Sequence, residues 1–247
     1  MRIALLSDLH LTENGVHIWG VDTLGNFNKA IEKIRREPGL DAIVIAGDLS
    51  NDGSFWTYKY VDDKLNETGI PSFCCPGNHD SISMMMNEYS PSCFHRDTVS
   101  FIGEYKLILL NSVVPDDVEM GKNKSRGWLF PDSFELLRQE LSDGKPAIVV
   151  LHHPPIEPGG WLNRKLLDNR DDFKCLLENF DNVRLVMYGH THFFHETKIH
   201  NALYVAPSGV GFAFDKDLQK FEIADGQEGY VIIDITSERI DIVRRYL

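Results

Sequence analysis

Ala42-Ile43-Val44-Ile45-Ala46 is an unbroken apolar run that ends at once in Gly47-Asp48. Runs of this length without polar alternation are typical of strands buried on both faces. Three other runs have the same character: Ile3-Ala4-Leu5-Leu6, Ile148-Val149-Val150-Leu151 and residues 183–187. Each run is followed within three residues by an acidic or imidazole side chain. The pattern predicts buried strands that carry polar side chains at their carboxyl ends.

Helical patterns separate these strands. Apolar residues recur at spacings of three and four within residues 27–34, 56–65, 134–141 and 173–180. Strands therefore alternate with helices, which predicts an α/β fold. Further strand-like runs form clusters without long helices inside them: 99–102, 106–110, 202–205, 230–235 and 240–243. We expect these runs to build an additional antiparallel sheet, so that a two-sheet sandwich is flanked by helices.

The 247 residues are 43% hydrophobic and 25% charged, enough to bury a sizeable core, and we expect a single domain over residues 1–247. No segment approaches the roughly 18 uninterrupted apolar residues of a membrane span. The first apolar run stops at Asp8, too early for a secretion signal, so we expect a cytoplasmic protein. The cysteines lack metal-finger spacing and are predicted to be reduced thiols. They are Cys74, Cys75, Cys93 and Cys175.

The formal net charge is −12. Binding to a nucleic-acid polymer requires clustered Lys and Arg, so we expect no such partner. A small anionic substrate stays compatible with this charge, because bound divalent cations would attract anions to the cleft itself. Composition does not indicate an oligomeric state.

Five polar blocks contain residues of the types that commonly bind metal ions. They are Asp8-Leu9-His10, Gly47-Asp48, Gly77-Asn78-His79-Asp80, His152-His153 and Gly189-His190-Thr191-His192. Ligands gather at the carboxyl ends of strands in open α/β sheets, so we expect these side chains to converge. Mixed carboxylate, amide and imidazole donors suit Mn, Fe or Zn better than Ca or Mg. A single Asp-x-His motif is more often part of a turn. The presence of all five blocks together is what predicts a metal site.

Together the five blocks resemble the calcineurin-like metallophosphoesterases, whose pattern is D-x-H, G-D, G-N-H-D/E, H and G-H-x-H. The chain is similar in particular to the class III cyclic-nucleotide phosphodiesterases. The segments that carry this similarity are 19–23, 47–54, 151–155, 161–163, 167–169 and 206–208. The resemblance covers nearly the whole chain and implies an α/β metallophosphoesterase fold with four layers, α/β/β/α.

The resemblance also implies two divalent or mixed-valence metal ions. The first ion would be held by Asp8, His10, Asp48 and His192. The second would be held by Asp48, Asn78, His152 and His190, with Asp48 bridging the pair. A bridging water would lose its proton near neutral pH and attack phosphorus as hydroxide. His79 is implied to be a catalytic residue that binds a phosphoryl oxygen or protonates the leaving alkoxide.

Three positions have more than one interpretation. Related phosphatases place an Asp three residues after the bridging carboxylate to orient such a histidine, and here Asn51 stands at that position with Asp52 next to it. Either residue is a candidate for orienting His79. His153 is expected to be a packing neighbour of the metal site rather than a ligand. Trp161 either stacks on a nucleobase or plugs its own loop.

We therefore predict a metal-dependent phosphoric ester hydrolase that acts on a small phosphodiester. The resemblance favours a 3′,5′-cyclic nucleotide such as cAMP. One alternative is a phosphodiesterase or phosphomonoesterase acting on another small substrate, such as a glycerophosphodiester or a nucleotide derivative. A more distant alternative is an inactive scaffold of the same fold. A scaffold predicts missing ligands, whereas all seven ligand positions are filled in this sequence.

Overall fold

The structure, a computed structural model, describes residues 1–92, 94–96, 98–114, 125–217 and 220–247. The strands of this part of the chain are β1 (Arg2–Leu6), β2 (Ala42–Ala46), β3 (Ser72–Cys75), β4 (Phe94–His95), β5 (Val99–Ile102), β6 (Tyr105–Leu109), β7 (Ala147–Val150), β8 (Val183–Met187), β9 (His195–Ile199), β10 (Ala202–Ala206), β11 (Gly229–Ile235) and β12 (Ile240–Tyr246). The α-helices are α1 (Thr23–Ile34), α2 (Phe55–Asn66), α3 (Pro131–Leu141) and α4 (Arg170–Leu177). Short helical turns occur at η1 (Glu13–Gly15), η2 (Met84–Glu88) and η3 (Gly160–Arg164).

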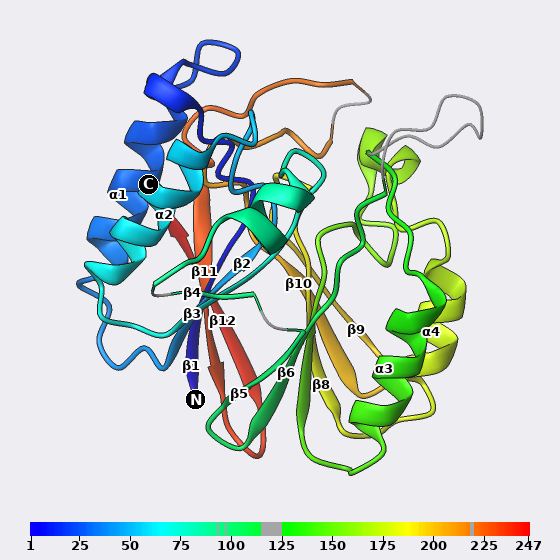
Figure 1. Cartoon of the computed structure of the whole chain (residues 1–247). Helices are drawn as coiled ribbons and strands as arrows, with labels where there is room; N and C mark the ends of the chain where they lie inside the picture. The colour runs from blue at the N-terminus through cyan, green and yellow to red at the C-terminus, as the bar shows by residue number, and fades with distance from the viewer. Residues whose placement is uncertain (93, 97, 115–124, 218–219) are drawn as a thin grey trace.

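Two six-stranded sheets face each other between pairs of helices (Figure 1). The first has the order β12-β11-β1-β2-β3-β4, and the second has the order β5-β6-β7-β8-β10-β9. Parallel pairs form the centre of both sheets, while β11, β12, β5 and β9 pair antiparallel to their neighbours. The α/β fold with four layers, α/β/β/α, is confirmed.

One detail of the expected topology is wrong. The runs without intervening helices do not build a sheet of their own, because β11 and β12 extend the first sheet beside β1 while β5, β6 and β10 belong to the second. Apolar runs that are buried on both faces have the same composition in either sheet. Their pattern reports burial and leaves the choice of pairing partner open.

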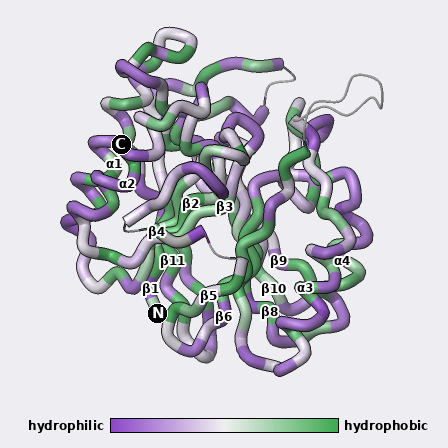
Figure 2. The backbone as a smooth tube through the Cα atoms, in the orientation of Figure 1, coloured by the Kyte–Doolittle hydropathy of each residue, from purple (hydrophilic) through white to green (hydrophobic). Residues whose placement is uncertain are grey.

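The strands divide their side chains between two of the hydrophobic layers. Along β1, Ala4 and Leu6 pack toward α1 and α2, whereas Ile3 and Leu5 pack between the two sheets. This division follows from the alternation of side chains along a strand. A third layer lies between the second sheet and the helices α3 and α4. Figure 2 shows the result, with hydrophobic residues along the strands and hydrophilic residues on the outer faces of the helices.

Hydrogen-bonding caps fix where the first two helices begin. The Asp22 carboxylate accepts from the Gly25 amide at 2.8 Å at the start of α1, and Ser54 Oγ accepts from the Thr57 amide at 3.3 Å at the start of α2. Such caps satisfy amides that have no partner within the helix. The preceding loops are thereby held at the carboxyl ends of β1 and β2.

The cysteines are consistent with reduced thiols. Cys74 and Cys75 are buried on β3, Cys175 is exposed on α4, and none of these three is in a disulfide. Cys93 lies outside the described residues. Among the helices that the structure describes, none combines the length and apolar character needed to cross a membrane.

Candidate metal centre

The predicted ligand loops meet at one edge of the sandwich. Backbone hydrogen bonds continue the β1–β2 pairing past the strand ends, from the Asp8 amide to Gly47 O and from the His10 amide to Asp48 O, both at 3.0 Å. A further bond crosses between the sheets, because the His190 amide donates to the Asp8 carboxylate at 3.1 Å. Segments that lie 182 residues apart in sequence are therefore joined by hydrogen bonds at this edge.

Several ligand residues have an uncommon backbone conformation. Eight non-glycine residues with positive φ occur in the described ranges, and five of them are predicted metal ligands. These five are Asp8, His10, Asp48, His190 and His192. Residues with a Cβ rarely adopt this region, which costs on the order of 1–3 kcal/mol for each residue and is found mainly at functional sites. The strain is maintained where the loops aim side chains at a common centre.

Two glycines make room for this arrangement. A Cβ on Gly77 would collide with the amide nitrogen and carboxylate of Asp48. Gly47 has a φ of 86°, and a Cβ there would collide with the His152 ring. The glycines of the G-D and G-N-H-D blocks are thus required by close approach.

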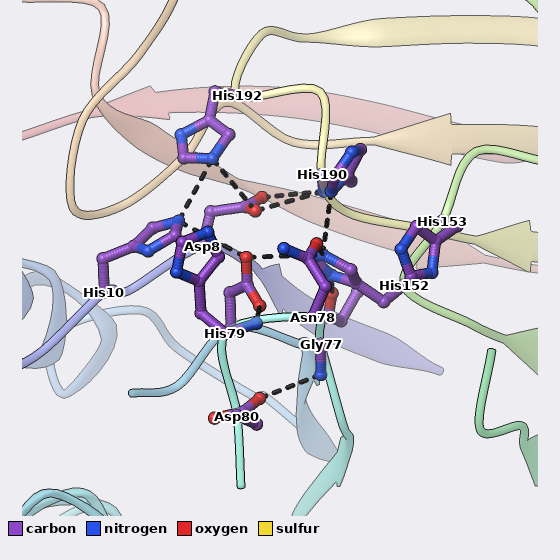
Figure 3. Close-up of polar contacts among 12 residues, drawn as sticks. Asp8, His10, Gly77, Asn78, His79, Asp80, His152, His153, His190 and His192 are labelled. Carbon is purple, nitrogen blue, oxygen red and sulfur yellow. Dashed lines mark hydrogen bonds and ion pairs between the residues drawn. The ribbon is translucent and has the colours of Figure 1, made fainter. Parts of the chain in front are cut away.

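Asp8, His10 and His192 form the first group of converging donors (Figure 3). His192 Nε2 lies 3.2 Å from Asp8 Oδ1 and also 3.2 Å from His10 Nε2. The other nitrogen of each ring is already committed, since His192 Nδ1 donates to Phe212 O at 2.9 Å and His10 Nδ1 donates to Asn51 Oδ1 at 3.2 Å. Both Nε2 lone pairs therefore face the same point.

Asn78, His152 and His190 form the second group, which Asp48 joins to the first. His152 Nε2 lies 3.1 Å from Asn78 Oδ1 and 3.1 Å from His190 Nδ1. His152 Nδ1 is 2.8 Å from Ala46 O and donates to it. Asp48 Oδ2 is 3.4 Å from His152 Nε2 and 3.4 Å from His10 Nε2. The Asp48 carboxylate therefore lies between the two groups.

Burial decides the charge of these groups. Burial lowers the pKa of both His10 and His192 to about 4, so both rings are neutral near pH 7. Burial opposes a proton on His152 as well, but the Asp48 carboxylate outweighs it and raises the pKa of His152 to about 9. The same attraction, acting against burial, holds the pKa of Asp48 well below its usual range. Burial raises the pKa of Asp8.

This donor set fits a pair of metal cations. His10 and His192 are neutral imidazoles whose Nδ1–H groups are committed, so each can only offer a lone pair at Nε2. Two such lone pairs at 3.2 Å, beside a buried carboxylate, repel one another unless a cation binds between them. Imidazole, amide and carboxylate donors together are the set that first-row transition metals and zinc prefer.

His79 differs from the seven predicted ligands in exposure. The ligands are each 7% exposed or less, whereas His79 is only partly buried. Its amide donates to Asp48 Oδ1 at 2.8 Å, and its ring lies edge-on to His10 at 4.7 Å between centroids. The His79 ring can therefore contact a molecule in the cavity, while its backbone is held by the Asp48 carboxylate.

Asn51, Asp52 and His153 surround the site and have defined hydrogen-bond partners. Asn51 holds its amide oxygen toward His10, and the Asp52 carboxylate accepts from the Glu13 and Ser54 amides at 2.7 and 3.0 Å. His153 is fully buried, and its Nδ1 lies 2.9 Å from Ser112 Oγ. Figure 3 shows His153 to one side of the converging donors. These contacts place His153 in the packing around the site.

Asp80 has a structural role that its sequence pattern did not reveal. Its carboxylate accepts from the amides of Gly77, Ser50 and Leu49 at 2.9, 2.9 and 3.2 Å, and from Tyr58 Oη at 3.1 Å. It therefore joins the Asp48 loop to the Asn78 loop. Burial, with Asp48 nearby, raises the pKa of Asp80 to about 7. The signal in the sequence was the acidic fourth position of Gly77-Asn78-His79-Asp80.

A cavity of about 280 Å³ opens over the donors. His79 and five of the seven predicted ligands line its floor, and Ser125, Leu162 and Lys165 line its sides. Its remaining wall is aromatic and consists of Trp19, Trp161, Phe212, Phe214 and Phe221. Sequence patterns gave no reason to bring Lys165 and Phe221 together, because both lie in irregular segments.

Known proteins are similar to this chain in sequence and in fold. The 3′,5′-cyclic-nucleotide phosphodiesterase of a Nostoc species is 28% identical over 245 residues, covering 96% of this chain and 89% of that protein. The 3′,5′-cyclic adenosine monophosphate phosphodiesterase CpdA of Pseudomonas aeruginosa is 31% identical over 192 residues, covering 76% of this chain and 68% of that protein. A dimetal phosphatase from Danio rerio shares the fold, with a TM-score of 0.72 at 13% identity over 100% of this chain and 96% of that one.

A family model also matches the segment that contains every predicted ligand. It describes the calcineurin-like phosphoesterases and matches residues 1–194. The match extends from before Asp8 to beyond His192, and so covers the donors of both groups. The predicted resemblance and the predicted class of enzyme, a metal-dependent phosphoric ester hydrolase, are thereby confirmed. The chain belongs to the calcineurin-like phosphoesterase family.

Proposed function

We propose that the chain is a phosphodiesterase that uses two metal ions to hydrolyse a 3′,5′-cyclic nucleotide such as cAMP. One observation carries this proposal above the others, namely the two buried groups of lone-pair donors that share Asp48. The cyclic-nucleotide phosphodiesterases among the similar proteins support the choice of substrate.

We assign the ligands of the two ions as follows. The first ion would be held by Asp8, His10, Asp48 and His192. The second would be held by Asp48, Asn78, His152 and His190. Manganese, iron and zinc are the candidates that this donor set supports. When bound, the ions would supply Lewis-acid stabilisation of phosphoryl charge and a water of lowered pKa.

The residues of the chain would act on the substrate by position and charge. The partly exposed His79 ring lies on the cavity side of the donors, where it can bind a phosphoryl oxygen or give a proton to the leaving alkoxide. In the reaction a water oxygen bonds to phosphorus, one P–O ester bond breaks, and the released alkoxide takes up a proton. The orienting bonds from His10 to Asn51 and from His152 to Ala46 would keep each Nε2 aimed at the ions.

The dimensions of the cavity support a small substrate. About 280 Å³ lies just below the range for small-molecule pockets, roughly 300–1,000 Å³, which favours one small ligand over a polymer. A net charge of −12 also disfavours a nucleic-acid polymer.

Two broader assignments accompany the substrate. We infer that residues 1–247 act as one domain, which is supported by the pairing of the late strand β11 with the first strand β1. We also infer a reducing compartment, the cytoplasm, which is supported by the three cysteines without disulfides in the described ranges.

The proposal is tested by comparing substrates on manganese-loaded protein. We expect turnover of 3′,5′-cAMP and bis(p-nitrophenyl) phosphate to exceed that of p-nitrophenyl phosphate. Asp48→Ala should abolish all three activities, whereas Asp171→Ala, which removes an exposed carboxylate on α4, should abolish none.

Each of the other possible results would indicate a different function for the chain. Cleavage of the synthetic diester without cAMP turnover would indicate another small diester as substrate. Preferential cleavage of p-nitrophenyl phosphate would indicate a phosphomonoesterase. No activity at full metal content would indicate a scaffold of the same fold.

A further inference from the structure

The cavity over the metal centre has an aromatic rim that is built from three separate segments. Trp19 is 60% exposed and Phe221 is 41% exposed, and their ring centroids lie 4.4 Å apart in a T-shaped contact. Trp161 approaches from the third segment and lies 5.4 Å from Phe214. Aromatic rings that stay this exposed contribute little burial of apolar surface to the stability of the fold. Clusters of exposed apolar side chains often mark binding sites.

This rim is directly connected to the metal centre. Phe212 stacks on His192 with a centroid distance of 4.4 Å and contacts Trp19 at 4.9 Å. One phenylalanine ring therefore separates the rim from a proposed metal ligand. A molecule whose phosphate meets the metals would place the group on its other end against the rim.

The backbone that carries Trp19 is strained. Ile18 and Val21 exchange two backbone hydrogen bonds, at 3.1 and 2.9 Å, so that Trp19 and Gly20 form a two-residue turn. Both central residues have positive φ, 49° and 84°, as a type I′ turn requires. Such turns favour Asn, Asp or Gly at the first central position, and a bulky ring there is an outlier. The turn itself gives no reason for a tryptophan.

Leu162, not Trp161, closes the loop that follows Gly159. Leu162 is 1% exposed and packs in a cluster with Phe193, Phe212 and Phe214. Trp161 is only partly buried at the margin of this cluster. Leu162 therefore fills the role of hydrophobic plug that was considered for Trp161. The Trp161 indole lines the cavity.

Two hydrogen-bond donors accompany the rings. Trp161 Nε1 is buried and has no hydrogen-bond partner among the described residues. Lys165 is half-buried, and its Nζ lies over the Trp161 ring at 5.8 Å from the centroid. A ligand that offers both a flat face and ring acceptors would complement these groups.

We propose that Trp19, Trp161 and Lys165 form a subsite for a purine base, so that the substrates are purine 3′,5′-cyclic nucleotides. The inference rests on the proposed function and deepens it. A two-ring base offers more stacking surface than a pyrimidine. Adenine and guanine both present N7 as an acceptor, so donors alone admit either purine.

The test compares kcat/KM for four cyclic diesters: cAMP, cGMP, cCMP and methyl riboside 3′,5′-cyclic phosphate, which has no base. Manganese-loaded wild-type protein should favour both purines over cCMP, and cCMP over the base-free diester. Trp161→Leu should lower kcat/KM for cAMP by about 5- to 150-fold, the range for loss of one base–aromatic stack. Most of the change should be in KM.

Three further variants make the test specific. Trp19→Asn supplies the residue that the turn prefers, so it should fold at least as stably as wild type while losing purine preference. Trp161→Phe keeps a ring and should retain most of the preference. Trp56→Leu removes an indole that stacks on Tyr60 in α2, outside the cavity, and should leave all four substrates unchanged.

The outcomes separate this inference from the proposed function. If the wild type turns over all four diesters equally, or if Trp161→Phe, Trp161→Leu and Trp19→Asn all keep the wild-type ratio of cAMP to base-free turnover, the purine subsite is wrong and the phosphodiesterase stands. If manganese-loaded wild type cleaves no cyclic diester, the proposed function fails and the subsite with it. Quenching of tryptophan fluorescence by 5′-AMP, reduced in Trp161→Phe and Trp19→Asn but not in Trp56→Leu, gives a readout independent of turnover.

Discussion

Asn51 Oδ1 lies 3.2 Å from His10 Nδ1 and thereby turns His10 Nε2 toward His192 and Asp48. The contact fixes both the tautomer and the orientation of a ring that the proposed function assigns to the first metal ion. Asn51, which was considered as the residue that orients His79, thus orients a proposed metal ligand. Asparagine suits this task because its oxygen accepts the Nδ1–H without adding charge to a buried site.

Asn51→Ala should weaken metal binding at the first position. Loss of such a partner typically costs about 10- to 100-fold in metal affinity. We expect this loss in a competition titration of manganese against a chelator. Asn51→Asp keeps the acceptor and should recover part of the affinity, while Asn66→Ala, at the exposed end of α2, should have no effect. Equal affinity of Asn51→Ala and wild type would remove Asn51 from the account.

His79→Ala should slow turnover while leaving the metal content unchanged. A positioned proton donor contributes about 10²- to 10⁴-fold, and it matters most when the leaving group is a poor one. We therefore expect kcat for cAMP to fall far more than kcat for bis(p-nitrophenyl) phosphate, whose leaving group needs no proton. The exposed His200 provides the control variant His200→Ala.

Two results would change the role of His79. An equal loss for both substrates would show that it binds a phosphoryl oxygen and does not protonate the leaving group. Loss of bound metal would make it a ligand, in line with its place beside His10 and Asp48.

Tyr58→Phe should destabilise the protein by about 1–3 kcal/mol, the cost of leaving buried polar partners unsatisfied. Tyr58 is fully buried, donates to Asp80 Oδ1 at 3.1 Å and accepts from the Ser81 amide at 2.8 Å. Urea unfolding measures the change. Tyr60→Phe is the matched control, since Tyr60 is partly exposed and donates only to Asn28 at 2.8 Å. If both variants lose the same stability, the Tyr58–Asp80 contact has no special weight.

Glu37 predicts a pH-dependent term in stability. A hydrogen bond from Arg245, with Arg2 at 3.3 Å, lowers the pKa of Glu37 from its ordinary value of 4.5. The folded-state pKa lies below the unfolded one, so the stabilisation is present above about pH 4.5 and is lost as the pH falls through the lowered value. Glu37→Gln should therefore be less stable than wild type at pH 7, and the difference should shrink toward pH 3.

Urea unfolding at several pH values measures the Glu37 term. Glu238→Gln, at an exposed position, should show no pH-dependent difference from wild type. A Glu37→Gln difference that stays constant from pH 7 to pH 3 would mean that the ion pairs of Glu37 do not contribute.

Much of the candidate site could be predicted from the sequence, because its residues lie just beyond the carboxyl ends of successive strands. Asp48 stands two residues after the end of β2, and His152 stands two residues after the end of β7, so their positions could be predicted without knowing the sheet order. Sheet membership could not be predicted, because β2 and β7 are both wholly apolar although they lie in different sheets. Pairing depends on contacts between distant segments, and local pattern does not carry that information.

The cavity rim followed from the sequence much less well. Trp161 was recognised as a candidate for stacking, but nothing in the pattern joined it to Trp19, 142 residues earlier, or to Phe221. These residues lie in turns and loops, whose positions are set by tertiary contacts. Residues 115–124, where the sequence predicts a loop beside the site, lie outside the described residues.

The most direct test of the account is a titration of metal-free protein with manganese while cAMP hydrolysis is measured. Two ions that share Asp48 predict no activity without metal, a rise that ends at two equivalents per chain, and loss of both activity and metal in Asp48→Ala. Full turnover by the metal-free protein, or full metal content in Asp48→Ala, would contradict the shared carboxylate and the two-metal phosphodiesterase built on it.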